Sequence, residues 1–234
     1  SKLGGQINLA ERLPGRSEFG GITTNLANKL QRQNVEIKLN TKVSADFVMQ
    51  EAPEVVILAT GGKSYEPLID GRENAHVVTA WQILEGKANV GSRVAIADWR
   101  CDWVGLGLAE LLARQGCHVR LACNGMVPGQ TVHQYVRDNW LGKLHKLNVQ
   151  TFTHLRLHGI DSEDAYFQHT LSGEPVILND VDTLVTAFGA GSFNNLEKEL
   201  KNTFDTDLHV IGDALSPRTV EEAILDGLKA STII

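Results

Sequence analysis

The apolar positions in the first 65 residues follow a helical spacing and then two strand patterns. Residues 22–33 carry apolar side chains four positions apart, which predicts an amphipathic helix. Residues 35–39 alternate between apolar and charged side chains and therefore predict a strand with one polar face. The apolar run at 55–59 leads into Gly61-Gly62, a pattern typical of a buried parallel strand followed by a tight turn.

A second set of periodic segments has the pattern of a strand, a helix and another strand. Residues 94–98 and 118–123 are short apolar runs, and residues 105–115 between them have helical spacing. Gly116 stands where a glycine commonly ends a helix. Together these segments predict a βαβ unit, which needs about 30 residues.

Two further helices are predicted beside this unit. Thr79 is placed to cap a short helix that runs through residue 84. Apolar residues between 132 and 147, Tyr135 among them, outline one face of a helix that ends near Lys146.

The remainder of the chain is predicted to be mostly strands before a final helix at 219–230. The strands are expected at 149–153, 165–170, 175–179, 181–188 and 208–213. Ser172-Gly173 is a hairpin signal, so the first three of these strands are expected to form an antiparallel meander. The pattern as a whole predicts an α/β protein with parallel sheets and a small antiparallel meander inserted in them.

Composition narrows the classes of function. The net charge is −6, the pI is about 5.7 and no basic cluster is present, which disfavours nucleic-acid binding. No apolar run reaches the roughly 18–20 residues of a membrane helix, and the polar opening does not resemble a signal peptide, so a cytoplasmic protein is expected. Three cysteines without a CxxC motif argue against a disulfide framework or a redox dithiol of the thioredoxin-reductase type. No Cys/His spacing indicates a metal site or an iron–sulfur cluster in this chain.

Three segments with glycines are the main functional signal. They are Gly4-Gly5-Gln6, Ala59-Thr60-Gly61-Gly62 and Ile211-Gly212-Asp213-Ala214. The last two follow predicted parallel strands, and ligands of open parallel sheets bind beyond the carboxyl ends of the strands. Glycines there let backbone amides approach a phosphate or a flat ring, and the Asp213 carboxylate can accept hydrogen bonds from a ribose or ribityl hydroxyl. A strand that ends in Ala-Thr-Gly is equally common as a plain turn.

Three stretches, taken together, resemble a known family. They read GGQINLAERLPGRSEF, VVILATGGKSYEPLIDG and VIGDALSPRTVEEAILDGLKAS. The whole chain resembles the C-terminal, nucleotide-binding half of the old-yellow-enzyme-like NADH:flavin oxidoreductases, which include 2,4-dienoyl-CoA reductase, trimethylamine dehydrogenase and histamine dehydrogenase. The second stretch is similar to the family's ATG motif and the third to its Gly-Asp FAD motif. The resemblance implies a three-layer Rossmann-like fold of the FAD/NAD(P)-binding flavoprotein type.

The resemblance also implies cofactors, partners and a division into domains. Residues 1–75 and 181–234 would form a partial FAD-type domain without its first βαβ, and residues 76–180 an inserted NAD(P)-domain-like unit. This half would bind FAD or ADP, whereas FMN and a 4Fe–4S cluster would belong to a (β/α)₈ barrel that is absent from this chain and would be its partner. A homo-oligomer is also compatible with the resemblance. The cofactor-binding residues implied are Gly4, Gly5, Gln6, Thr60, Gly61, Gly212, Asp213 and Ala214.

The second unit departs from a working NAD(P)H site. Where GxGxxG is expected, residues 98–105 read DWRCDWVG. The carboxylates of Asp98 and Asp102 would repel a pyrophosphate, and Trp99 and Trp103 are expected to fill the abandoned pocket. NAD(P) is therefore not expected, which favours the amine-dehydrogenase or N-demethylase branch of the family.

No catalytic or metal-binding residue is assigned in this chain. The histidines lack an acid partner at a catalytic spacing, Cys101 is expected to be a free buried thiol, and Arg218 to face either a phosphate or solvent. We therefore expect a catalytically silent part of a flavin-dependent oxidoreductase that binds a nucleotide and supports electron transfer. Two alternatives stay open: a structural or docking domain with lapsed nucleotide sites, and an NAD(P)H-dependent enoyl or dienoyl reductase half.

Overall fold

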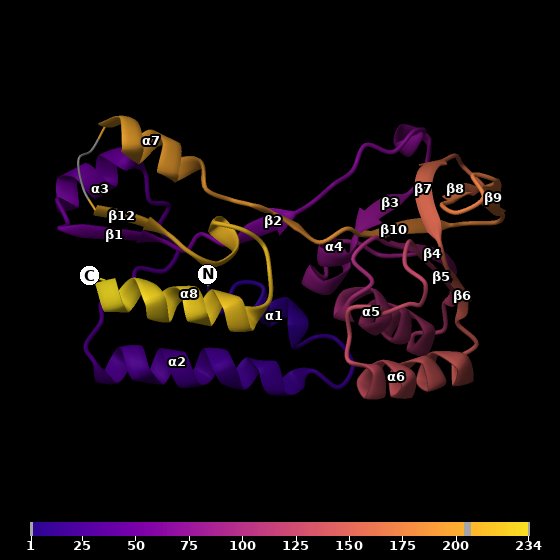
Figure 1. Cartoon of the computed structure of the whole chain (residues 1–234), viewed down its shortest axis with the longest axis horizontal. Coiled ribbons are helices and arrows are strands. Elements are labelled where there is room, and N and C mark those ends of the chain that lie inside the picture. Colours follow the sequence, from indigo (N-terminus) through magenta and orange to yellow (C-terminus); the bar gives the residue numbers. More distant parts are fainter. Residues whose placement is uncertain (1, 204–206, 234) are drawn as a thin grey trace. The chain divides into compact units, whose positions relative to one another are not determined.

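The computed structural model describes residues 2–203 and 207–233, which divide into two compact units (Figure 1). Unit 1 is formed by the described residues of Ser1–Gln6, Thr23–Tyr65 and Ala190–Ile234. Unit 2 is formed by Ile7–Ile22 and Glu66–Gly189.

Unit 2 is built on a five-stranded parallel sheet with the strand order β3-β10-β4-β5-β6. Its strands are β3 (Val77–Thr79), β10 (Thr183–Ala187), β4 (Arg93–Asp98), β5 (His118–Cys123) and β6 (Gln150–Phe152). Every residue of β10, and every residue of β4 and β5 after the first, is buried, because other layers cover both faces of the sheet. The strands predicted at 94–98, 118–123 and 181–188 are confirmed.

Strand β10 bears on the predicted division of the chain. It pairs with β3 on one side and β4 on the other, so its residues belong to the sheet of unit 2. The predicted boundary at residues 180/181 had placed this strand with the first 75 residues. The description of the units as an FAD-type and an NAD(P)-type domain stays a prediction.

Three layers make up unit 2, as Figure 1 shows. One face of the parallel sheet packs against α4 (Ala80–Glu85), α5 (Trp103–Arg114) and α6 (Gln134–Lys146). The other face packs against an antiparallel sheet of β7 (Leu155–Ile160), β8 (Ala165–His169) and β9 (Pro175–Leu178). The predicted fold class, α/β with parallel strands, three layers and a small antiparallel meander, is confirmed.

The composition of the meander corrects the sequence prediction. The strand predicted at 149–153 is β6, which joins the parallel sheet beside β5 instead of starting the meander. The first strand of the meander is β7, which was not predicted, because a register shift between Leu157 and Gly159 interrupts its alternation. The hairpin turn between β8 and β9 is confirmed, with Gly173 at φ +78°.

The helix ends follow the predicted signals. The Thr79 side chain accepts a hydrogen bond from the Gln82 N–H, and the Gln82 side chain accepts one from the Thr79 N–H, which is a complete capping box. Gly116, after α5, has the left-handed φ of +93° that favours glycine. Tyr135 was wrongly placed on the apolar face of α6, since it is 79% exposed and the helix buries Trp140 and Leu144 instead.

A buried carboxylate joins α5 to α6. Glu110 is 2% exposed, and its Oε2 accepts a hydrogen bond of 2.7 Å from the Trp140 indole N–H. Its Oε1 lies 2.7 Å from the Arg114 guanidinium. Both carboxylate oxygens are thereby bound, which makes burial of the charge tolerable.

Replacing Glu110 with leucine is expected to lower the free energy of unfolding of unit 2 by about 2 kcal/mol, because the Trp140 N–H would be buried without an acceptor. Glu110→Gln is the matched control, since the amide oxygen can still accept that bond, and it should cost less. All four tryptophans lie in unit 2, so urea unfolding followed by tryptophan fluorescence measures this unit. Equal losses in both variants would contradict the role given to the Trp140 bond.

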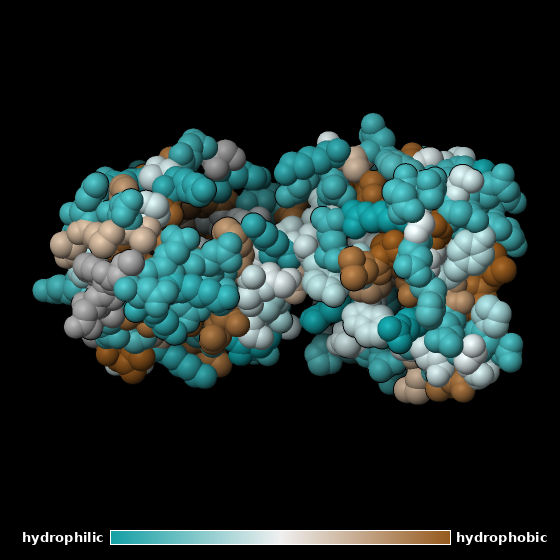
Figure 2. Space-filling model, turned by 90° about the horizontal axis from the view of Figure 1, so that it is seen from above, coloured by the Kyte–Doolittle hydropathy of each residue, from teal (hydrophilic) through white to brown (hydrophobic). Residues whose placement is uncertain are grey.

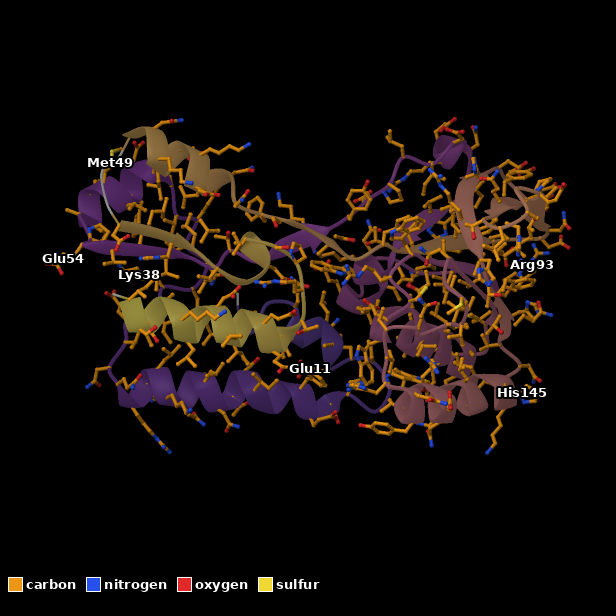
Figure 3. All side chains as sticks on the ribbon, in the orientation of Figure 1. Glu11, Lys38, Met49, Glu54, Arg93 and His145 are labelled. Carbon is orange, nitrogen blue, oxygen red and sulfur yellow. The ribbon has the colours of Figure 1, made fainter. Side chains whose placement is uncertain are left out.

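An ion-pair cluster ties the start of β4 to the start of β10. Arg93, labelled in Figure 3, lies 3.1 Å from Asp180 and 2.6 Å from Asp182. Hydrogen bonds from the side chain and backbone N–H of Arg93 lower the pKa of Asp182 below its ordinary value. The pairing helps fix the register of two strands that are far apart in sequence.

Unit 1 contains two small sheets and helices around them. Its elements are α2 (Gly20–Arg32, with its first three residues assigned to unit 2), α3 (Ala45–Glu51), β1 (Val55–Leu58), β2 (Gly62–Ser64), β11 (Ala190–Ser192), α7 (Asn195–Thr203), β12 (Asp207–Val210), the 3₁₀ turn η3 (Gly212–Ala214) and α8 (Val220–Ile233). Strands β1 and β12 are parallel, whereas β2 and β11 are antiparallel. Helices α3 and α7 pack their apolar side chains on β1 and β12 (Figure 1).

The shorter elements of unit 2 are α1 (Ile7–Ala10), η1 (Ser17–Phe19) and η2 (Arg72–Asn74).

The strand predicted at 35–39 is wrong. These residues pair with no strand in the described part of the chain, and their alternating apolar side chains are exposed. A strand forms only where its backbone finds a hydrogen-bonding partner, which alternation alone cannot guarantee. The strand predicted at 55–59 is parallel as expected but not fully buried, since Ile57 is 44% exposed.

Apolar side chains also reach the surface on α8, where Ile224 and Leu228 are exposed. Figure 2 shows brown, apolar patches between the more frequent teal, polar side chains. Within residues 2–203 and 207–233, no helix combines the length and the apolar character needed to cross a membrane.

Candidate functional site

The carboxyl edge of β1 and β12 collects two of the three glycine segments. Leu58 and Val210, the last residues of these parallel strands, are register partners. The chain therefore leaves both strands at the same edge, where residues 59–62 and 211–214 follow. The Ile211 N–H donates to the Leu58 oxygen over 3.0 Å, which continues the pairing into the second segment.

Glycines at this edge are required by the backbone. Gly5, Gly61 and Gly212 have φ of +49°, +76° and +59°, in the left-handed region that side chains disfavour, and Gly4 has φ +108°. A Cβ on Gly5 or Gly61 would meet no atom within 4 Å, so these two glycines leave open space beside the backbone. Gly62 differs, because a Cβ there would lie 3.0 Å from the Gly191 oxygen in β11.

Asp213 is the central polar residue of this edge. The Gln6 amide donates to its Oδ2 over 2.7 Å, and the Arg218 backbone N–H donates to its Oδ1 over 3.2 Å. The structure thus brings Gln6, from the first glycine segment, to the third segment. A carboxylate oxygen can accept more than one hydrogen bond, so these contacts orient Asp213 and still leave it able to accept further hydrogen bonds.

The other predicted residues at the edge have structural partners. The Thr60 hydroxyl donates to the Phe193 oxygen, which holds the turn after β1 against the chain after β11. The Gly212 N–H donates to the Asp226 carboxylate of α8, and Ala214 is buried in the turn η3. Arg218, expected to face a phosphate or solvent, forms an ion pair with Asp226.

The amino end of α8 already holds an anion. The Glu222 carboxylate accepts hydrogen bonds from the Thr219 N–H at 2.8 Å and the Thr219 hydroxyl at 2.7 Å, and these bonds lower the pKa of Glu222. A phosphate would compete with this carboxylate. The edge of unit 1 therefore fits a sugar hydroxyl and a flat ring better than a phosphate at the start of α8.

The corresponding edge of unit 2 is filled by Asp98, the last residue of β4. Its side chain is buried, and its Oδ1 accepts the Cys101 N–H over 2.9 Å. A Cβ on Gly105 would lie only 2.0 Å from Asp98 Oδ2, so the carboxyl group packs directly on the first turn of α5. Burial raises the pKa of Asp98 well above its ordinary value, and the nearby charge of Asp102 raises it further.

Asp102 occupies the amino end of α5. Its Oδ1 accepts the Val104 N–H over 2.9 Å as the helix cap. Cys101, just before it, adopts a left-handed φ of +51°. Two carboxyl groups thus stand where a dinucleotide pyrophosphate meets a helix terminus, and the residues present do not fit NAD(P).

The tryptophans of this loop do not fill a pocket as expected. Trp99 is 44% exposed and stacks on Phe188 with ring centroids 5.9 Å apart. Trp103 packs against Trp140, and the Arg16 guanidinium lies 3.3 Å from the centre of its ring. Side-chain direction depends on where the helix starts, and α5 begins at Trp103, two residues earlier than predicted.

One group of residues at this edge was missed. β5 ends beside β4, with Cys123 as the register partner of Asp98, and the following Asn124 accepts a hydrogen bond from Cys101. Two predicted parallel strands that end in Asp98 and Cys123 were the available signal. In the described residues, no three His, Cys, Asp or Glu side chains gather as a metal ion would require.

Comparison with known proteins places this geometry in a family. No family model matches the chain. The "probable N-methylproline demethylase" of Rhizobium meliloti is 36% identical over 263 residues, which covers 98% of this chain and 38% of that protein. The N,N-dimethylglycine/sarcosine dehydrogenase of Chromohalobacter salexigens is 27% identical over 266 residues, covering 97% and 38%. Both relatives align with nearly the whole chain.

The chain belongs to the old-yellow-enzyme-like NADH:flavin oxidoreductase family. Among solved structures, the 6-hydroxypseudooxynicotine amine oxidase of Pseudomonas geniculata superposes with a TM-score of 0.90 at 25% identity, covering 98% of this chain and 36% of that one. The predicted resemblance is confirmed.

Members of this NADH:flavin oxidoreductase family differ in the reactions their names describe. The relatives of this chain include amine dehydrogenases and demethylases as well as reductases. The chain spans 28–38% of the length of these relatives. It therefore corresponds to the C-terminal part of flavin-dependent oxidoreductases.

Proposed function

We propose that unit 1 contributes to a binding site for FAD or ADP and supports electron transfer in a flavin-dependent amine dehydrogenase or N-demethylase. The observation that supports the proposal is the carboxyl edge of β1 and β12, where Gly61 and the buried Gly212 adopt left-handed backbone conformations next to Asp213. Open parallel sheets bind nucleotides at such an edge.

Each residue at the edge has a role in this proposal. Gly5 and Gly61 let the backbone approach a ring or ribose, since a Cβ there would meet no atom within 4 Å, and Gly4 supplies a positive φ before them. Asp213 accepts a hydrogen bond from a ribose or ribityl hydroxyl, and Gln6 holds the carboxylate in position. Thr60, Gly212 and Ala214 shape the two turns.

The chemistry belongs to the part of the protein that carries the substrate. A bound flavin supplies the two-electron chemistry of amine oxidation. By resemblance, FMN and a 4Fe–4S cluster would be held by a (β/α)₈ barrel, the natural partner of this half. We assign no catalytic residue to the chain itself.

The loop after β4 supports the amine branch over the NAD(P)H-dependent reductases. NAD(P)H would have to displace the buried Asp98 carboxyl group and the Asp102 cap from the start of α5. Two relatives whose names refer to methylated amines support the same branch.

A docking or structural domain is the second candidate. It is favoured by the hydrogen bonds that already engage Asp213 and by the Glu222 carboxylate at the start of α8. In that case the edge of unit 1 would keep the geometry of a nucleotide site without its affinity.

Calorimetric titration with ADP, FAD and NADPH distinguishes these functions. ADP or FAD should bind, and Asp213→Ala should raise the Kd on the order of tenfold, the loss of one charge-assisted hydrogen bond. Glu36→Ala removes an exposed carboxylate from the same unit and should leave the Kd unchanged. Binding of NADPH alone would favour a reductase half, and binding of none of the three would favour the docking domain.

A further inference from the structure

A cavity lies beside the antiparallel sheet of unit 2. Its volume is about 340 Å³, which is in the usual range for a site that takes a small molecule. The residues that line it come from the segment that leads into η2 and from β7 and β8, and they are Asp70, Gly71, His158, Gly159, Ile160 and Tyr166. None of them lies at the carboxyl edge of β1 and β12 or at that of β4 and β5. The cavity is therefore separate from both of those edges.

Two glycines hold one wall of this cavity against the sheet. Gly71 has a left-handed φ of +79°, and a Cβ there would lie 2.0 Å from the Ile160 oxygen. A Cβ on Gly159 would lie 2.9 Å from the Asp70 oxygen. The Ile160 N–H donates to that same oxygen over 2.9 Å, which ties the segment to β7 where its register shifts after Leu157. Irregularities of this kind re-aim side chains and are frequent beside binding sites, so the wall is a fixed part of the fold.

Asp70 brings a carboxylate to this wall. Its backbone N–H and oxygen are both bonded to β7, but its side chain has no hydrogen bond or ion pair with any described residue. Arg72, two positions later, already pairs with Glu66 over 2.6 Å. No lysine or arginine is among the described residues that line the cavity, and the His158 Nε2 lies 3.4 Å from the Gln168 side-chain oxygen. The Asp70 carboxylate is therefore available to a cation that enters from solvent.

Tyr166 supplies an aromatic ring in a fixed position. Its side chain faces away from the parallel sheet, since Ala165 and Phe167 on either side of it are buried against that sheet. Its hydroxyl donates to Asp161 Oδ2 over 2.6 Å, and this bond raises the pKa of Tyr166 to about 12, so the phenol stays neutral. Ile177, its register partner on β9, is 49% exposed and extends the apolar surface beside the ring. The cavity thus combines a held aromatic ring with an unpaired carboxylate.

We propose that this cavity binds a small organic ammonium ion with an apolar body. The ammonium group donates a charge-assisted hydrogen bond to the Asp70 carboxylate, and its positive charge lies against the Tyr166 ring, whose face attracts cations. The apolar body lies along Tyr166 toward Ile177. An anion is disfavoured, because the carboxylates of Asp70 and the neighbouring Asp161 repel it. The site is built from residues of unit 2 alone, so it does not depend on nucleotide binding by unit 1.

Three ligands of one shape and different charge test the site, namely benzylammonium, benzyl alcohol and benzoate. Each is titrated into the 234-residue chain and followed by the ¹H–¹⁵N NMR spectrum of the protein. Benzylammonium should shift the amide signals of Gly71 and Gly159, which line the cavity. Benzyl alcohol should bind on the order of tenfold more weakly, since it lacks the charge, and benzoate should leave these signals in place.

Substitutions separate the two contacts. Asp70→Asn should raise the Kd for benzylammonium on the order of tenfold, since the amide keeps the shape of the side chain and loses its charge. Glu73→Gln is the matched control, because Glu73 is an exposed carboxylate of η2 that does not line the cavity, and it should leave the Kd unchanged. Tyr166→Leu removes the ring and should raise the Kd about threefold, whereas Tyr166→Phe keeps the ring and should change the Kd less.

Three results would overturn the proposal. They are binding of benzyl alcohol or benzoate as tight as that of benzylammonium, an unchanged Kd in Asp70→Asn, and shifts that leave out Gly71 and Gly159. Circular dichroism of each variant shows whether it is folded. The ligand series uses the unchanged chain, so the preference for a cation is judged even if a variant does not fold.

Discussion

Gly105→Ala is expected to lower the free energy of unfolding of unit 2 by about 2–3 kcal/mol. Gly105 lies in the first turn of α5, where helix and strand pack so closely that a Cβ would be 2.0 Å from Asp98 Oδ2. The carboxyl group cannot move aside easily, because its other oxygen is bonded to the Cys101 N–H inside a buried loop. Alanine has a higher helix propensity than glycine, so propensity alone would predict a more stable protein. A loss of stability would therefore come from the steric clash.

Gly142→Ala is the matched control for this prediction. Gly142 is a helical glycine on the exposed side of α6, where a Cβ would meet no atom within 4 Å, so alanine should stabilise the unit by up to about 1 kcal/mol. In the Asp98→Ala background the cost of Gly105→Ala should fall by more than half, because the clashing atom is gone. Urea unfolding followed by tryptophan fluorescence measures the unchanged chain, the three single variants and the double variant, and an unchanged cost in the Asp98→Ala background would refute the contact.

The second large effect concerns pH. Because burial raises the pKa of Asp98 in the folded protein, the folded state binds its proton more tightly than the unfolded chain does. The stability of unit 2 should therefore be greatest near or below the ordinary carboxyl pKa of about 4 and fall as the pH rises toward the raised value. Within that window the slope can reach about 1.4 kcal/mol per pH unit.

Asp98→Asn should remove this slope, since asparagine keeps an oxygen for the Cys101 N–H and has no proton to lose. The variant should gain stability relative to the unchanged chain as the pH rises from 5 to 8. Asp138→Asn, on the exposed side of α6, should keep the original profile. Parallel profiles for the Asp98 variant and the unchanged chain would mean that Asp98 is ionised in the folded protein and stabilised in another way.

Much of the fold could be predicted from local pattern. The runs at 94–98 and 181–188 are so apolar that only a strand covered on both faces accommodates them, and they became central strands of the five-stranded sheet. Thr79 and Gly116 marked helix ends because capping is a contact between near neighbours in sequence. The glycines at 61 and 212 were found because their backbone conformation is a local property.

Other elements depended on partners that a pattern does not name. Residues 35–39 alternate like a strand but lack a neighbouring strand among the described residues, and 149–153 joined the parallel sheet because β5 offered a free edge. Strand β7 was missed because a register shift broke its alternation. In each case the decisive hydrogen bonds join residues distant in sequence.

For the candidate sites, too, some features follow from the sequence and others only from the tertiary structure. The sequence by itself determined the chemistry available: glycines and Asp213 at one sheet edge, and carboxylates in place of a glycine-rich loop at the other. Only the tertiary structure decided that Gln6 binds Asp213, that Asp98 packs on Gly105, that Trp103 turns toward Arg16 and that the Cys101 thiol donates to Asn124. The physical reason is that composition and spacing set the propensities of a segment, whereas side-chain contacts depend on where the ends of separate strands and helices come together in space.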